Sequence, residues 1–456
     1  MFWGTLLTMG KKSFDLTQGP ILNRLLLVAI PIMGTQIMQM TYNLTDMFWL
    51  GWLGGGALAA SGAAGMYLWL AMAFMMLGRM GAEIGVSQRL GAGDREAAES
   101  FSRSAILIAA IVGAAYALAT YLFSDQLIAF FAIREREVAF DAARFLSIAG
   151  LGSLPLFVAS AIGGAFTGSG NSRIPFFISS IGIVLNILLA PLLIFIFKFG
   201  IIGAAIATVI AQSTVCILSV LAIYFHKERP FIKFTMLIKP DVKKISQILV
   251  WSTPISVESF LFTLLTMAIS RFIASFGVNA LVVSRIGTQI ESLTWLIGGG
   301  FASAVTSFTG QNFGARKWSR IHKCFRISVA AMSVWGLLVS IVIFAFGRNM
   351  FYIFQREPEI LDMGAEYMRI LAFCQVAMCL EGAGASIFRG VGETVKPSVV
   401  SVVCNALRVP LAYFLSRTAL GLTGIWIGVT AGACLRGVWM IIWILIRKRR
   451  LPAADG

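Results

Sequence analysis

Four carboxylates lie within or at the ends of long apolar stretches of the sequence. They are Asp46, Glu258, Glu291 and Glu381. An ionised carboxylate at membrane depth costs roughly 2.5–3.5 kcal/mol on insertion scales, so such residues are retained mainly where they have a task. Three arginines share this apolar setting, namely Arg285, Arg408 and Arg436. The acids can therefore bind cations or protons, or they can form structural ion pairs with the arginines.

Asp46 is the most informative of these acids because polar residues precede it at helical spacing. Asn43 and Gln39 lie three and seven residues earlier, so the three side chains share one helix face, which Tyr42 borders. We predict that Asp46 lies in the outer half of its span, where it is reversibly protonated or binds a cation. The alternative is a carboxylate that is simply hydrated at a helix end.

Pro31 lies in the same apolar stretch as Asp46, fifteen residues earlier. A proline within a span leaves a backbone carbonyl free and permits a bend. We predict that Pro31 is the hinge of the helix that carries Asp46. A static kink is the alternative.

The C-terminal half offers a second candidate site. Glu291 and Trp295 are four residues apart and share a helix face. A carboxylate beside an aromatic ring suits a planar organic cation. We predict that these residues bind substrate, that Glu258 and Glu381 line the same cavity, and that Tyr42 also contacts the substrate. Alternatively, Glu291 pairs with an arginine at the same depth and Trp295 faces lipid.

The elements that carry these residues are predicted to be transmembrane helices. The chain has 456 residues, of which 58% are hydrophobic and only 13% are charged, too few charges to cover a soluble protein of this length. We predict an all-α polytopic membrane protein with twelve spans. The predicted spans are 21–46, 57–80, 103–123, 143–163, 174–197, 201–225, 246–270, 280–304, 324–347, 362–386, 397–416 and 422–446.

The distribution of basic residues predicts how the spans are oriented. The N-terminus, the even-numbered loops and the C-terminus hold 25 Lys and Arg residues, whereas the odd-numbered loops hold nine. Loops rich in Lys and Arg stay in the cytoplasm, so we predict cytoplasmic termini in the plasma or inner membrane. We expect the side of the protein that carries these basic loops to attract anionic lipid headgroups. Because the charges are spread over separate loops, we expect no nucleic-acid partner.

An internal repeat divides the chain. A shift of 223 residues places Pro31 on Pro254, Gln88 on Gln311 and Gly91 on Gly314, and the segment 166–170 later falls on 388–392. We predict two six-helix bundles, 1–230 and 231–456, joined by the basic segment 226–244. Because six is an even number, both halves enter the membrane from the same side, and a pseudo-two-fold axis runs along the membrane normal. Secondary transporters with such repeats bind substrate at the repeat interface.

Enzyme and receptor functions are weaker alternatives. The two histidines, His226 and His322, lie in predicted loops, and the sequence contains no Walker A motif for ATP binding. We find no polar catalytic cluster, so we predict no catalytic residue, metal site or cofactor. We expect a monomeric secondary transporter.

Several motifs together resemble the multidrug and toxic compound extrusion (MATE) family and, within it, the DinF-like branch. They are Asp15-Leu-Thr-Gln-Gly-Pro20, Ala29-Ile-Pro-Ile32, Tyr42-Asn-Leu-Thr-Asp46, Gly310-Gln-Asn-Phe-Gly-Ala315 and Phe388-Arg-Gly-Val-Gly392. The resemblance covers nearly the whole chain. It implies two six-helix bundles in a V-shaped molecule, and an antiporter that expels organic, often cationic, compounds in exchange for H⁺ or Na⁺.

The resemblance also implies roles for individual residues. Asp46 matches the acidic residue of the family's first span, and Asn186 and Thr208 match positions that help to build its N-terminal cation site. The family's fifth span usually reads Asn, three apolar residues, Asp, Pro, but Ala190 stands where that Asp would be. Na⁺ thereby loses one oxygen ligand, whereas a proton needs only one carboxylate. We therefore predict that H⁺ drives transport through Asp46.

A flippase for lipid-linked sugars, from a related branch, is the alternative transport function. Such an anionic cargo requires basic residues that face the cavity. Arg285, Arg408 and Arg436 are the candidates.

Overall fold

The computed structural model describes residues 15–131, 133, 135–225 and 241–448, and the regular secondary structure of this part of the chain is helical. The N-terminal helices are α2 (Ile21–Leu53), α3 (Gly55–Gly91), α4 (Arg95–Leu122), α5 (Ser124–Ala129), α6 (Arg136–Leu151), α7 (Ser153–Gly168), α8 (Arg173–Pro191), the π-helical turn η2 (Leu192–Ile196) and α9 (Ile201–Phe225). The C-terminal helices are α10 (Val242–Ala274), α11 (Val278–Gly314), α12 (Trp318–Tyr352), α13 (Pro358–Ala372), α14 (Gln375–Gly390), α15 (Val395–Ser416) and α16 (Gly421–Lys448).

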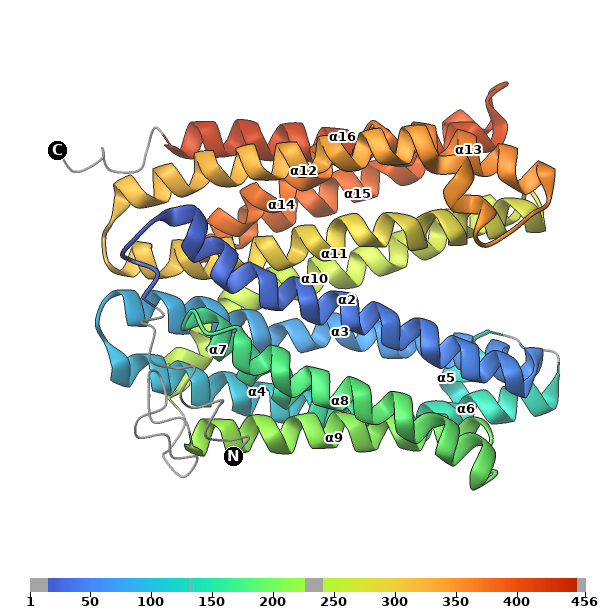
Figure 1. Ribbon diagram of the computed structural model, residues 1–456, viewed down its shortest axis with the longest axis horizontal. Helices are drawn as coiled ribbons and strands as arrows, with labels where there is room; N and C mark the ends of the chain where they lie inside the picture. Colours follow the sequence, from blue (N-terminus) through green and yellow to red (C-terminus); the bar gives the residue numbers. More distant parts are fainter. Residues whose placement is uncertain (1–14, 132, 134, 226–240, 449–456) are drawn as a thin grey trace.

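The helices make this chain an integral membrane protein with twelve spans. In the described residues, ten helical segments are each long and apolar enough to cross a bilayer, and the pair α13 and α14 forms an eleventh span that bends by 44°. The twelfth, α11, is 37 residues long and runs alongside the others (Figure 1). It is more polar because it carries Arg285 and Glu291 and many Ser, Thr and Gly residues. The predicted fold class is confirmed.

Some helices differ from the predicted spans in length or continuity. The first span does not end at Asp46, because α2 continues for two more turns to Leu53 and ends at Gly54, whose φ of +122° favours glycine. The fourth span is split between α6 and α7 at Gly152. The fifth finishes in a π-helical turn directly after Pro191, whose missing N–H disturbs the helical hydrogen bonding.

The two halves of the molecule are related as the repeat predicts. Repeat-related helices run in the same direction, α2 with α10 and α3 with α11 (Figure 1). The amide of Gln88 donates to the carbonyl of Gly390 at 2.8 Å, and its counterpart Gln311 donates to that of Gly168 at 2.9 Å. Such reciprocal contacts are the signature of a two-fold relation. The parallel directions place the axis along the helices, and hence along the membrane normal.

One end of the molecule is rich in basic residues, and we call it the basic end. There α3 and α11 finish, and α4 and α12 begin, near Arg89, Arg95, Arg316 and Lys317. The first residue of α2 and the last residue of α16 lie at the same end (left in Figure 1). The described ends of the chain are therefore on one side of the membrane, as predicted.

The hydrophobic cores show where the two bundles meet. In the half nearer the basic end, Leu25 and Val28 of α2 pack into the core of the C-terminal bundle, and Ile248 and Trp251 of α10 pack into that of the N-terminal bundle. In the opposite half, the three described core clusters each stay within one bundle. The bundles are thus joined at the basic end by two crossed helices.

The predicted division of the chain at residues 230 and 231 falls outside the described residues, as does most of the predicted linker 226–244.

Candidate functional site

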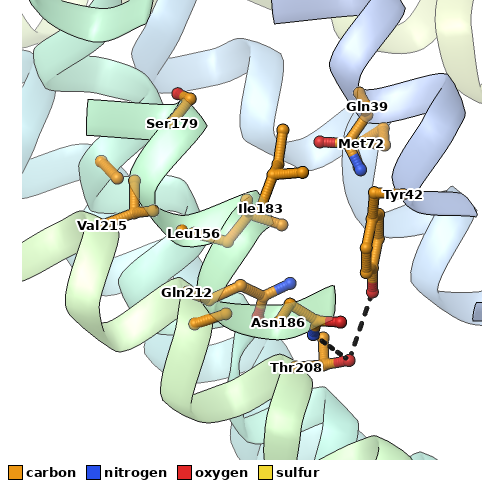
Figure 2. A pocket seen from close by; sticks show the side chains of 13 residues that line it. Gln39, Tyr42, Met72, Leu156, Ser179, Ile183, Asn186, Thr208, Gln212 and Val215 are labelled. Atoms are coloured by element: carbon orange, nitrogen blue, oxygen red, sulfur yellow. Dashed lines mark hydrogen bonds between the residues drawn. The ribbon is translucent and has the colours of Figure 1, made fainter. Parts of the chain in front are cut away.

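A polar cluster lies inside the N-terminal bundle, where α2, α8 and α9 meet. Tyr42 Oη and Thr208 Oγ1 are 3.2 Å apart, and Asn186 Nδ2 lies 3.3 Å from the same hydroxyl (Figure 2). The three residues are separated by up to 166 positions in the sequence. The structure therefore brings together the residues that the resemblance assigned to the N-terminal cation site, with Tyr42 as an additional member.

The direction of the hydrogen bonds in this cluster follows from the Thr208 hydroxyl. It donates to the carbonyl of Ala204 one turn earlier, at 3.0 Å. Since a hydroxyl has a single hydrogen, Tyr42 and Asn186 must both donate to Thr208 Oγ1. These two bonds occupy both lone pairs of the oxygen, so Thr208 can ligate a metal ion only if one of them breaks.

The cluster opens on a small, mostly apolar cavity. The cavity has a volume of about 140 Å³ and is lined by Gln39, Tyr42, Asn186, Thr208 and Gln212, with apolar side chains between them (Figure 2). A second cavity, of about 230 Å³, is also lined by Gln39 and extends along α3 as far as Arg79. The N-terminal bundle therefore contains two neighbouring cavities, each with a few polar side chains among mostly apolar ones.

Asp46 lies one helical turn beyond Tyr42 on α2. Its side chain is half-buried, and its Oδ1 atom is buried without a hydrogen-bond partner among the described residues. Gln39 Nε2 and Asn43 Oδ1 are 3.5 Å apart on the same helix, although Asn43 is exposed. The polar stripe exists as a helix face, but the Asp46 carboxylate is not itself among the residues that line the cavity.

Two further predicted residues are placed on α2 and α8. Pro31 lies inside α2, where its carbonyl accepts the Thr35 hydroxyl at 3.0 Å, next to Ile32 of the inter-bundle core. Ala190 is buried in an apolar cluster with Leu50 and Ala60. No side-chain oxygen is supplied at Ala190.

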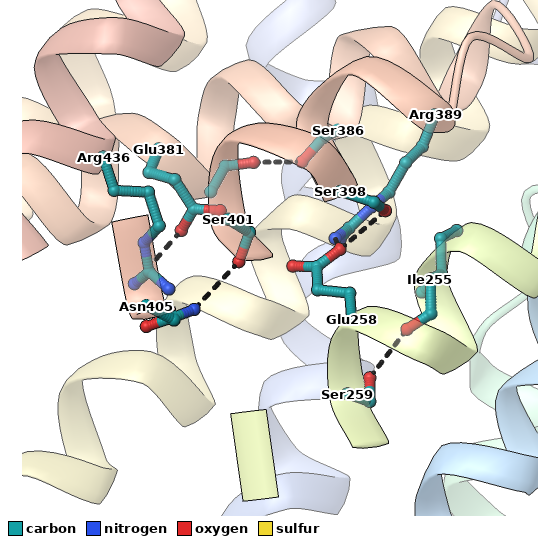
Figure 3. A network of polar contacts seen from close by, with 11 residues as sticks. Ile255, Glu258, Ser259, Glu381, Ser386, Arg389, Ser398, Ser401, Asn405 and Arg436 are labelled. Atoms are coloured by element: carbon teal, nitrogen blue, oxygen red, sulfur yellow. Dashed lines mark hydrogen bonds and ion pairs between the residues drawn. The ribbon is translucent and has the colours of Figure 1, made fainter. Parts of the chain in front are cut away.

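In the C-terminal bundle, two of the predicted acids are held by arginines. Glu258 Oε2 lies 3.5 Å from a guanidinium nitrogen of Arg389 and accepts the Ser398 hydroxyl at 2.8 Å (Figure 3). Glu381 Oε2 lies 3.6 Å from a guanidinium nitrogen of Arg436. Each acid is thus part of an intra-bundle ion pair, which is the structural alternative that the sequence left open.

Glu291 differs from these two acids. No hydrogen bond or ion pair of Glu291 is found within the described part of the chain, and its charged neighbours are Arg408 and Arg436. Trp295, one turn further along α11, is 42% exposed. Among the predicted C-terminal acids, Glu291 is therefore the one whose carboxylate is not already paired.

The three arginines do not form one exposed basic surface. Arg408 is buried, donates to Thr266 Oγ1 at 2.9 Å and lies over the Phe262 ring at 5.0 Å. Arg436 is engaged with Glu381, and only Arg285 is exposed. The pattern expected for an anionic cargo, with all three arginines in the cavity, is not observed.

Sequence reasoning missed Glu83, a fully buried carboxylate on α3. Its Oε1 accepts the hydroxyls of Ser303 at 2.7 Å and of Ser307 at 3.2 Å, both from α11 of the other bundle. The predicted second span ended at residue 80, which placed Glu83 in a loop. Its position between apolar and glycine residues in 80–86 was the available signal that the helix continues.

Known proteins match most of this chain. The family model described as MatE matches residues 31–192 and again residues 254–414. The chain is 25% identical over 434 residues to the "probable multidrug resistance protein NorM" of Thermotoga maritima, covering 94% of this chain and 93% of that protein. It is 24% identical over 444 residues to the "multidrug export protein MepA" of Staphylococcus aureus, covering 95% of both.

Solved structures share the fold. One, described as a multidrug resistance MATE family transporter of the MOP superfamily in an outward-facing conformation, superposes with a TM-score of 0.90 at 22% identity, covering 97% of this chain and 99% of that chain. Another, a MOP superfamily transporter from Pyrococcus furiosus described as having a binding pocket of reverse polarity, superposes with a TM-score of 0.91, also at 22% identity and the same coverage.

Proposed function

Because this chain belongs to the MatE family, whose model matches both of its halves, we propose that it is a secondary active antiporter that exports organic cations in exchange for H⁺. The broader function, multidrug efflux by a membrane transporter rather than an enzyme, is that of the family. The driving ion, the charge of the substrate and the orientation are our proposals, as is a monomeric state.

We propose that the basic end faces the cytoplasm, with both chain termini, because Lys and Arg are retained on that side of a membrane. The inter-bundle cores lie in the half nearer that end, and the cores of the opposite half stay within single bundles. With this orientation, the described conformation is closed towards the cytoplasm. A cleft between the bundles would then open outwards, where a drug is released.

The choice of H⁺ over Na⁺ rests on one observation, the unpartnered buried oxygen of Asp46. A proton would satisfy that carboxylate directly. A dehydrated Na⁺ would need several oxygen ligands, but Thr208 already accepts two hydrogen bonds and Ala190 contributes no oxygen. Protonation of Asp46 would change its interactions with Tyr42 and Asn43 on the same helix face, and α2 would then shift about Pro31.

Transport by the purified protein in proteoliposomes tests this proposal. We expect efflux of a cationic dye when a pH gradient is imposed at equal sodium, because the proton is the coupled ion. A sodium gradient at clamped, equal pH should give no more dye movement than empty vesicles. Full activity on the sodium gradient alone would contradict proton coupling and leave the family assignment intact.

For the substrate, we propose that Glu291 is the carboxylate that meets an organic cation, with Trp295 stacking against it. Glu258 and Glu381 belong to the same region but act through their ion pairs with Arg389 and Arg436. The single unpaired acid can neutralise a cation without first breaking an internal bond.

Substitution of Glu291 with glutamine tests this assignment. Glu291→Gln should weaken binding of a cationic compound by about tenfold or more, and binding of a neutral compound of similar size much less, because only the charge interaction is removed. Equilibrium dye binding measured by fluorescence polarisation checks this. Asp362→Asn, in an exposed ion pair with Arg348, is the control, and it should leave binding of both ligands unchanged. Equal losses for both ligands in Glu291→Gln would contradict the assignment.

A further inference from the structure

The contact between the bundles at the basic end is built almost symmetrically. Gln88 and Gln311 make the reciprocal hydrogen bonds described above. Their neighbours Gly91 and Gly314 each lie so close to the opposite helix that an added Cβ would be 1.9 Å from a carbonyl oxygen, of Gln311 and Gln88 respectively. We call this contact between α3 and α11 the basic-end seal.

Glu83 breaks the symmetry of this seal. The repeat places Thr306 at the equivalent position of α11. Within the described residues, the Thr306 hydroxyl bonds only to carbonyls of its own bundle, those of Ala302 at 3.0 Å and Ser386 at 3.3 Å. Glu83 instead accepts two hydroxyls from the opposite bundle. In the part of the chain that the structure describes, the ionisable side chain of the seal that crosses between the bundles is thus Glu83, from the N-terminal bundle.

The charged groups around Glu83 come from both bundles. Arg79 lies one turn earlier on α3, and Arg389 of α14 lies on the other side of the interface, next to Glu258. Hydroxyl donors bind an ionised carboxylate about twice as strongly as a neutral acceptor. The ionised form of Glu83 therefore draws the two bundles together through Ser303, Ser307 and the nearby Arg389.

The interior of the N-terminal bundle connects this region with the Asp46 region. Arg79 lines the inner cavity of about 230 Å³, and that cavity shares Gln39 with the outer cavity next to Tyr42. The two neighbouring cavities, mostly apolar but with polar side chains such as Tyr42, Gln39 and Arg79, therefore extend from within one helical turn of Asp46 to within one helical turn of Glu83. Such cavities can hold water that carries protons between the two carboxylates.

We propose that Glu83 is a second proton-binding residue, which holds the basic-end seal closed when ionised and releases it when protonated. Uptake of one proton converts the carboxylate to a carboxylic acid, and its bonds to Ser303 and Ser307 lose their charge assistance. The bundles can then separate at this end, and the acid returns its proton to the solvent that enters. This proposal depends on the proposed function in one respect: it takes the proton to be the driving ion.

Distance measurements across the basic end test the proposal without any transport. Spin labels are attached at Glu96→Cys on α4 and Lys323→Cys on α12, both exposed, in a chain whose six native cysteines are replaced. In lipid nanodiscs, the labels in the otherwise unchanged chain should move apart as the pH falls. In Glu83→Gln, the ratio of separated to closed molecules at alkaline pH should rise by about tenfold and lose its pH dependence.

Two other variants separate a specific role of the charge from general damage. The double change Ser303→Ala and Ser307→Ala should shift the ratio in the same direction, because it removes the donors and retains Glu83. The matched control is Glu366→Gln, which alters a similar carboxylate–hydroxyl bond, to Thr423 at 2.8 Å, within one bundle. It should leave the distances unchanged.

A third variant separates this proposal from the proposed function. Asp46→Asn should keep the pH response of the seal even though coupled transport is lost. A closed seal in Glu83→Gln with an unaltered pH response would overturn the role of Glu83. So would a response that disappears in Asp46→Asn but persists in Glu83→Gln.

Discussion

Replacement of Asp46 with asparagine should abolish drug efflux driven by a pH gradient and leave the protein folded in the membrane. Asparagine has the shape of the protonated acid but cannot release a proton, so the variant is held in one charge state. The side chain is half-buried and its Oδ1 atom has no partner among the described residues, so little packing is lost. Dye transport in proteoliposomes with an imposed pH gradient measures the effect.

A matched change elsewhere in the chain shows whether the loss is specific to this carboxylate. Asp362 forms an exposed ion pair with Arg348 at 2.9 Å, and surface pairs of this kind contribute only about 0–1 kcal/mol. Asp362→Asn should therefore transport as well as the unchanged protein. Normal pH-driven efflux by Asp46→Asn would rule out this residue as the proton carrier.

The second large effect is expected at Gly91. The backbone carbonyl of Gln311 occupies the position that a side chain would need, since an added Cβ would lie 1.9 Å from its oxygen. Gly91→Val should therefore force α3 and α11 apart and prevent the basic end from closing, with loss of transport. Overpacking of this kind typically costs about 1–3 kcal/mol. The spin-label distance between residues 96 and 323 should lengthen at all pH values.

Gly65 provides the comparison for this substitution. It lies on the same helix, but an added Cβ would meet no atom within 4 Å. Gly65→Ala should leave both transport and the closed distance unchanged, and it should slightly favour the helix. If Gly91→Val closed the basic end as fully as Gly65→Ala does, the tight approach of α3 and α11 would not be what seals the molecule.

The periodicity of the sequence was sufficient to predict the fold class. Apolar stretches of about twenty residues, separated by short charged segments, are typical of transmembrane helices. In lipid, such a stretch must form a helix because the helix satisfies its own backbone hydrogen bonds. The 223-residue repeat also predicted the relation of the halves, because parity alone determines whether the axis lies along the membrane normal. The stripe of Gln39, Asn43 and Asp46 was likewise visible, since residues at this spacing share a face of any helix.

The ends of the helices were harder to predict. A charge usually marks the end of a span in sequence, but Glu83 is buried within α3 because hydroxyls of the opposite bundle solvate it. Asp46 similarly lies two turns before the end of α2. For Glu83 the physical reason is that a polar residue can stay inside the membrane when another helix supplies its partner, and local sequence does not specify that helix.

Tertiary structure alone decided which acids are paired and which remain available. Glu258, Glu291 and Glu381 are similar in sequence, each in an apolar stretch that shares its depth with arginines. Packing of α10 against α15 brings Glu258 to Arg389 at the end of α14, 131 residues away, and packing of α14 against α16 brings Glu381 to Arg436. Glu291, on α11, has Arg408 and Arg436 as charged neighbours but forms no ion pair with either in the described part of the chain. In a low-dielectric interior, the groups within a few ångströms of a charge decide whether that charge is stabilised. The sequence gives the order of residues along the chain, but it does not say which of them become neighbours in space.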